Sequence, residues 1–142
     1  MSVRAVLRLD LHQPQVRELL TGPAGPVVRY IRSTLRRVRT RAVLRCPVRT
    51  GNLRNSLREE LLVRGDLIEG AVGTDVVYAL AVHDGTRPHT VRPRRARVLR
   101  FVAGGEVVFA ARVHHPGTRP RPFLREALRE VAGPAGFRIT TG

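Results

Sequence analysis

The clearest hydrophobic pattern in the chain is a helical stripe over residues 28–42. Its apolar residues recur at intervals of 3, 4, 3 and 4 positions: Val28, Ile31, Leu35, Val38 and Ala42. This spacing puts them on one face of a helix, which at 1.5 Å per residue is roughly 30 Å long. Pro26 suits the first turn, where no backbone N–H is needed, and Pro47 ends the helix. The pattern predicts one long amphipathic helix.

The middle of the chain alternates short apolar runs with turn residues. Residues 50–52 predict a turn, and residues 53–57 predict a short helical turn. Two β-rich runs follow, at residues 61–63 and 67–73, and they predict a pair of strands connected near Gly65.

Three further segments complete the predicted order of elements. Residues 76–82 are apolar enough to be buried, as either a strand or a short helix. Residues 98–103 and 107–113 flank a Gly-Gly pair, which is the strongest hairpin signal in the sequence. The helical spacing of apolar residues over 123–131 predicts a last helix.

This order of elements is typical of an α+β domain. We expect a mostly antiparallel sheet packed against one long helix, with a β-hairpin and a C-terminal helix. The 142 residues match the length of a single domain. We divide it into an N-terminal segment (1–25), a core (26–132) and a C-terminal tail (133–142). The N-terminal segment starts strand-like or as a short helix over residues 3–20, and a cluster of turn residues at 21–26 ends it.

The charge of the chain is strongly positive, with 26 basic residues, all of them arginine, against 11 acidic ones. The formal charge of +15 attracts phosphate backbones or acidic protein faces, and it opposes self-association unless a partner neutralises it. Two explanations of the arginine excess stay open: contact with DNA, and GC-rich codon usage. In either case we expect a binding partner.

The sequence predicts neither a membrane protein nor a disulfide. No run approaches the roughly 18 apolar residues that a membrane span needs, and the N-terminus lacks the pattern of a signal peptide. We therefore expect a protein made in the cytoplasm. The single cysteine, Cys46, has no Cys or acidic neighbour for a metal site and is interpreted as a structural thiol.

The histidines raise an enzyme as an alternative. A metal-dependent nuclease would suit so basic a chain, and suitable residue types are present at His83, Asp84, His89, His114 and His115. The spacing argues against it, because consecutive His114 and His115 point to opposite faces of a strand, and no Glu or Cys completes a ligand pattern. We expect surface or turn histidines, with no catalytic residue, metal or cofactor.

Two segments rich in arginine and proline are candidates for contact with a partner. Residues 87–95 predict a charged loop that is mobile in the free subunit and ordered by a neighbour. In residues 115–123, prolines limit the entropy lost on docking, and Phe123 anchors either its own core or a neighbouring subunit. The predicted contact residues are Arg87, Arg92, Arg94, Arg95, Arg119, Arg121 and Phe123.

Three segments, in order, resemble one protein family. RTGNLRNSL, VGTDVVYALAVHDGT and HPGTRPRPFLREAL are similar to segments of the neck proteins of long-tailed bacteriophages, the small head-tail joining or tail-completion proteins. The resemblance covers residues 26–132. It leaves open whether the chain belongs to the head side or the tail side.

The resemblance implies a structural role rather than an enzyme. The expected function is that of a subunit in an oligomeric ring of the virion neck, between the capsid portal and the tail tube, through which the genome passes. Expected partners are copies of the chain, the neighbouring connector and tail-tube proteins, and non-specific contacts with genomic DNA. A non-specific DNA-binding protein is the main alternative. Sequence-specific reading of DNA is not expected, because the sequence lacks aromatic interleaving, finger spacing and a helix-turn-helix.

Overall fold

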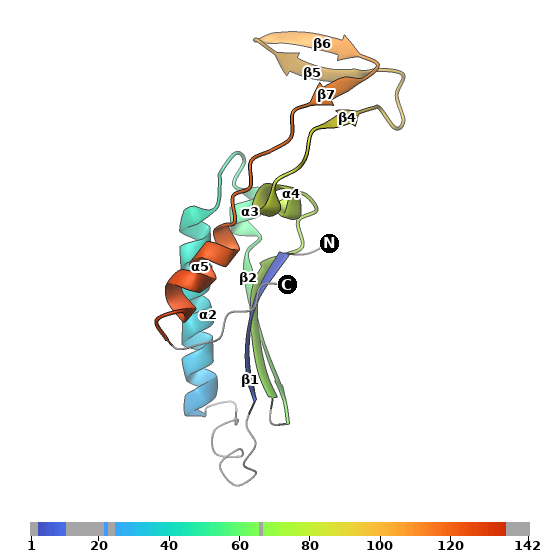
Figure 1. Cartoon of the computed structure of the whole chain (residues 1–142). Coiled ribbons are helices and arrows are strands. Elements are labelled where there is room, and N and C mark those ends of the chain that lie inside the picture. The colour runs from blue at the N-terminus through green and yellow to red at the C-terminus, as the bar shows by residue number, and fades with distance from the viewer. Residues whose placement is uncertain (1–2, 11–21, 23–24, 66, 136–142) are drawn as a thin grey trace.

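The computed structural model describes residues 3–10, 22, 25–65 and 67–135. It consists of a body, in which two helices pack on a sheet, and a ribbon (residues 85–122) that projects from one end of the body (Figure 1). The predicted α+β class is confirmed. Residues 11–21 and 23–24 of the predicted N-terminal segment and residues 136–142 of the tail lie outside the described residues.

The body contains a three-stranded antiparallel sheet in the order β1-β3-β2. Strand β1 is Val3–Asp10, so the start of the chain is a strand rather than a helix. The two strands predicted around Gly65 are confirmed and longer than expected, as β2 (Arg58–Arg64) and β3 (Leu67–Thr74).

The predicted long helix is α2 (Pro26–Arg45), and it lies beside the last helix, α5 (Phe123–Ala132), on one face of the sheet (Figure 1). All five residues of the predicted stripe are buried. Gly70 on β3 is needed for this packing, because a Cβ atom there would lie 2.6 Å from a methyl carbon of Leu35. The apolar spacing therefore correctly identified the face of α2 that meets the sheet.

Two short helices cover the end of the body from which the ribbon projects. Helix α3 (Asn52–Asn55) is the predicted helical turn, and α4 (Ala79–Asp84) decides the strand-or-helix alternative in favour of a helix. The expected burial of residues 76–82 is only partly correct. Val77 is 88% exposed and Tyr78 is 46% exposed, because both precede the helix. Within 76–82 only Ala79 is fully buried, and Val76, Leu80 and Val82 are partly buried against the core.

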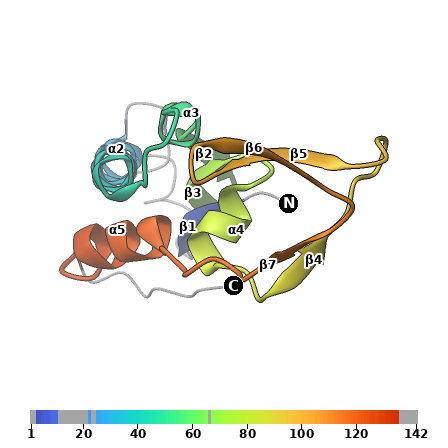
Figure 2. The same ribbon diagram turned by 90° about the horizontal axis from the view of Figure 1, so that it is seen from above.

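The ribbon contains two antiparallel pairs of strands, β4 (His89–Val91) with β7 (Val113–His115) and β5 (Leu99–Ala103) with β6 (Glu106–Ala110). The predicted hairpin is confirmed, and Gly104 and Gly105 both adopt the positive φ that a tight hairpin turn requires. Seen from above, the ribbon reaches away from α5 and bends back (Figure 2).

Two sequence-based expectations for the ribbon were wrong in detail. The run at 107–113 is not one strand, because β6 ends at Ala110 and Val113 begins a separate strand. Residues 87–95 are not simply a loop, since His89–Val91 pairs with β7. The partner lies more than twenty residues away along the chain, so local composition gave no sign of this pairing.

The ribbon is fixed to the body at its base. Thr86 and Thr118 exchange two backbone hydrogen bonds of 3.0 Å, and the Arg121 N–H donates to the Val82 carbonyl of α4 at 3.0 Å. Gly117, with φ of 90°, lies so close to the opposite strand that a Cβ atom would be 2.3 Å from the Thr86 carbonyl oxygen. This close approach sets where the ribbon leaves the body.

Candidate partner-binding surfaces

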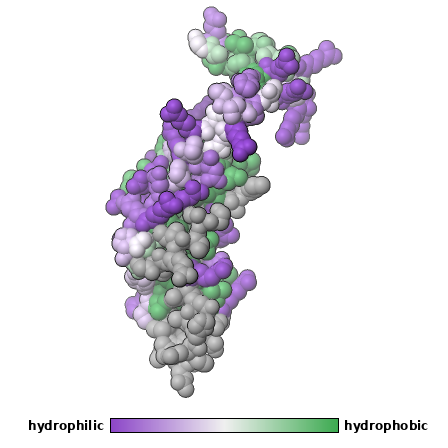
Figure 3. Space-filling model, viewed as in Figure 1, coloured by the Kyte–Doolittle hydropathy of each residue, from purple (hydrophilic) through white to green (hydrophobic). Residues whose placement is uncertain are grey.

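The β5–β6 hairpin (residues 99–110) is apolar on both of its faces. The register places Phe101 opposite Val108 on one face, and Val102 opposite Val107 on the other. Val102 is 69% exposed and Phe109 is 62% exposed. In the space-filling view, apolar side chains gather at the end of the ribbon among polar ones (Figure 3).

No side chain from residue 84 to residue 122 is buried, so the hairpin has no core of its own. Strands β5 and β6 pair only with each other, which leaves the outer edge of each strand unpaired within the described residues. A two-stranded hairpin alone is marginally stable in water, and exposed apolar patches mark surfaces that bind other proteins. The hairpin is therefore a candidate contact surface.

The rest of the ribbon is strongly cationic. Residues 85–122 contain nine arginines and one glutamate, a formal charge of +8. None of these arginines forms an ion pair with a described residue. Arg92, Arg94 and Arg95 all lie in the connection between β4 and β5, and Arg87 lies near the base. All six predicted contact arginines, including Arg119 and Arg121 near the base, are exposed on the ribbon.

A groove of about 850 Å³ lies at the base of the ribbon, between α3, α4 and the returning chain. Its apolar residues are Pro47, Val48, Leu53, Tyr78 and Val82. Three arginines also line this ribbon-base groove: Arg49 and the predicted Arg119 and Arg121. The Asn52 side-chain amide lies 3.3 Å from the Tyr78 hydroxyl and links two of its sides.

Arg49 was not among the predicted contact residues. It lies at the start of the RTGNLRNSL segment, far from Arg119 in the sequence, and only the fold brings the two to one groove. Its position in a segment that resembles the neck proteins was the one signal that could have identified it.

The structure corrects the expectation that Phe123 contacts a partner. Phe123 is 1% exposed and anchors its own core, where its ring meets that of His83 edge to face at 5.5 Å. His83 is also buried, contrary to the expected surface position, and its Nδ1 lies 2.6 Å from an Asp84 carboxylate oxygen. Both residues therefore belong to the packing that holds α4 against α5.

The remaining candidates for chemistry lie apart. His89 and His115 are cross-strand neighbours whose rings stack at 5.0 Å, whereas His114 is exposed on the other side of β7. Among the described residues, no three His, Cys, Asp or Glu side chains form a group that could hold a metal ion. Burial raises the pKa of the Cys46 thiol, and the nearby Arg54 charge opposes this effect.

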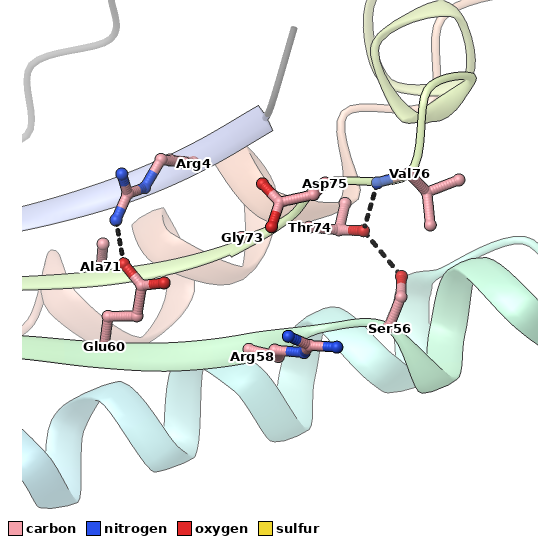
Figure 4. A pocket seen from close by; sticks show the side chains of 9 residues that line it. All are labelled: Arg4, Ser56, Arg58, Glu60, Ala71, Gly73, Thr74, Asp75 and Val76. Atoms are coloured by element: carbon pink, nitrogen blue, oxygen red, sulfur yellow. Dashed lines mark hydrogen bonds and ion pairs between the residues drawn. The ribbon is translucent and has the colours of Figure 1, made fainter.

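A second hollow, of about 200 Å³, lies on the sheet near the end of β3 (Figure 4). Its polar groups largely satisfy one another. Arg4 pairs with Glu60, and the hydroxyls of Ser56 and Thr74 lie 2.6 Å apart. The Thr74 hydroxyl also accepts from the Val76 N–H at 3.2 Å. This hollow is small, and its interactions join β1 to β2 across the sheet and the end of α3 to β3.

Ion pairs hold the two long helices of the body together. Arg45 of α2 lies 2.8 Å from Glu130 and 3.2 Å from Glu126, both on α5. The hydrogen bond from Arg45 lowers the pKa of Glu130 and raises that of Arg45 itself.

In the described part of the chain, no helix is both long and apolar enough to cross a membrane.

Comparison with known proteins adds no relative: the chain matches no protein-family model, and neither a curated protein nor a solved structure is significantly similar to it.

Proposed function

We propose that this protein is a structural subunit of an oligomeric ring, and that the ring joins head and tail in a long-tailed bacteriophage. The observation that carries the proposal is the β5–β6 hairpin, which exposes apolar side chains on both faces and has no core within its own chain. Burial of apolar surface drives most protein association. A partner that covers this hairpin therefore gives the ribbon its stability.

The positions of the three neck-like segments support the more specific part of the proposal. RTGNLRNSL contains α3, VGTDVVYALAVHDGT contains α4, and HPGTRPRPFLREAL contains the return of the ribbon and most of α5. Each of the three contributes residues to the ribbon-base groove. Segments that are separate in the sequence thus share one surface, as expected if their resemblance reflects a common binding role.

Non-specific DNA binding remains the second candidate function. The observation in its favour is the ribbon charge of +8, carried by arginines with no acidic partner among the described residues. Arginine binds the phosphate backbone without reading the bases. In a neck ring this charge would have a secondary role: it would let the ring contact the phosphates of the passing genome whatever its base sequence.

Light scattering after size exclusion, together with electron microscopy of the same fractions, separates the two functions. The ring proposal expects closed assemblies of defined mass without added nucleic acid. A chain that stays monomeric up to high micromolar concentration, and binds duplex DNA with a steep dependence on salt, would instead favour the DNA-binding function and overturn the ring.

A further inference from the structure

We infer that the β5–β6 hairpin of one copy inserts into the ribbon-base groove of the next copy. This inference rests on the proposed function, because it explains how the subunits of the ring would join. The ribbon has an exposed apolar hairpin at one end and an apolar groove of about 850 Å³ at the other.

Both the hairpin and the groove present apolar side chains that could pack against each other. The hairpin presents Val102, Val107 and Phe109, each at least 46% exposed. The groove offers Val48, Tyr78 and Leu53 among its lining residues. Aromatic residues and arginine are the types most enriched where proteins bind one another, and the groove contains both. Inserting the hairpin would remove apolar surface from water on both sides.

The distribution of charge also favours the hairpin, over the rest of the ribbon, as the part that enters the groove. Three arginines line the groove, and none of them has an ion-pair partner among the described residues. Glu106, beside the hairpin turn, is the single acidic residue between positions 85 and 122. Together with Arg100 it makes the hairpin electrically neutral in a ribbon of charge +8. The hairpin is thus the part of the ribbon that enters an arginine-lined groove with least repulsion.

The occupant is a neighbouring copy because the ribbon is fixed to its own body. The Thr86–Thr118 hydrogen bonds and the close approach at Gly117 hold its base beside the groove, while the hairpin stands apart from the body (Figure 1). A contact between two different surfaces of one chain joins subunits head to tail, and such contacts close into a ring when the rotation allows.

Charge reversal tests the contact in the full-length chain. Glu106→Arg alone, and Arg119→Glu with Arg121→Glu, should each weaken self-association at least about tenfold, because like charges facing each other are strongly unfavourable. In a head-to-tail contact, the triple variant restores opposite charges at every interface. Its dissociation constant, from sedimentation velocity, should return close to the wild-type value.

The matched control is Arg32→Glu with Arg129→Glu, which makes the same charge change at exposed helical positions outside the groove. It should leave association unchanged, and circular dichroism should show every variant folded. Loss of association in the control as well, or failure of the triple variant to recover, would overturn the hairpin-in-groove contact.

Cross-linking provides a readout that does not depend on charge. In a Cys46→Ala background, a chain with Glu106→Cys and Arg119→Cys should form a ladder of covalent oligomers on mild oxidation, and each single variant should stop at dimers. If disulfides formed only within single chains, the hairpin would lie in the groove of its own chain, and the inference would be wrong. Wild-type rings without any ladder would reject the inference and leave the ring function standing, whereas a monomeric wild type would reject both.

Discussion

The body and the ribbon differ in how far their apolar side chains are buried. In the body, side chains from α2, α5 and the sheet form one buried cluster that includes Val38, Ile68 and Phe123. In the ribbon, no side chain between positions 84 and 122 is buried, although β5 and β6 are as apolar as the strands of the body. The body thus has a core of its own, and in the proposed assembly a partner would cover the ribbon.

Under the proposed function, apolar residues serve two purposes in the chain. The stripe of α2 is apolar on one face, which is what one core requires. The hairpin is apolar on both faces, which is more than its own chain can cover. We therefore interpret the apolar surface that the hairpin leaves uncovered as a proposed contact for assembly. Substitutions of the same type in the two regions should have opposite consequences.

The largest contrast should come from truncating one phenylalanine in each region. Phe123→Ala removes a fully buried ring and should cost about 3–5 kcal/mol of unfolding free energy. Phe109→Ala, at a ring that is 62% exposed, should change the stability of the monomer by less than about 0.5 kcal/mol but weaken association. Urea denaturation below the association concentration measures the first effect and sedimentation the second. Equal costs in both would contradict the division into body and ribbon.

A second contrast lies within one helix. Leu35→Ala should cost about 2–5 kcal/mol, because Leu35 fills the space above Gly70. Leu44, on the exposed side of the same helix, is the matched control, and Leu44→Ala should change stability by less than about 0.5 kcal/mol. Thermal unfolding of both variants checks this. An unchanged melting curve for Leu35→Ala would mean that the apolar stripe of α2 does not pack in the core.

The joint between the two regions should show a smaller effect. Gly117→Ala places a side chain in the left-handed region, at about 1–2 kcal/mol, and forces it against the Thr86 carbonyl. Gly104→Ala has the same backbone strain but open space around it. Hydrogen exchange at Thr86 and Thr118 should accelerate only in the Gly117 variant. Acceleration of the same amides by Gly104→Ala would show that the joint is not fixed by this close approach.

The smallest effect is a pH dependence confined to the body. Because Arg45 lowers the folded-state pKa of Glu130 below the ordinary value of 4.5, Glu130 stabilises the fold above that pH. The stabilisation is lost as the pH falls through the lowered pKa. Wild type should therefore melt above Glu130→Gln at neutral pH, and the two curves should converge in acid. A difference between the two melting temperatures that stays the same from neutral pH into acid would contradict this assignment.

Local patterns were enough to predict the two long helices of the body and the hairpin of the ribbon. The 3.6-residue period of α2 and α5 and the Gly-Gly turn of the hairpin are properties of neighbouring residues, and each was placed correctly. The pairing of His89–Val91 with Val113–His115 was missed because it depends on residues far apart in the sequence. The interior position of His83 was missed for the same reason, since Phe123 covers it from another helix.

The candidate site was predicted only in part. Arg119 and Arg121 were chosen for their proline-rich context, and both line the groove. Phe123, chosen for its position at the start of the helix, lies in its own core, where it meets His83 of α4. Arg49 and the apolar walls of the groove come together only through tertiary structure, which no single stretch of sequence encodes.

The central claim is that the hairpin makes this chain an assembly subunit. Sedimentation velocity of the Val102→Ser, Val107→Ser, Phe109→Ser triple variant beside wild type tests it most directly, with Leu44→Ser as a control at an exposed leucine of the body. We predict a wild-type assembly of several subunits, an equally assembled control, and a triple variant that is monomeric but has the circular dichroism spectrum of a folded chain. A triple variant that assembles as wild type does, or a wild type that is itself monomeric at every concentration, would contradict the claim.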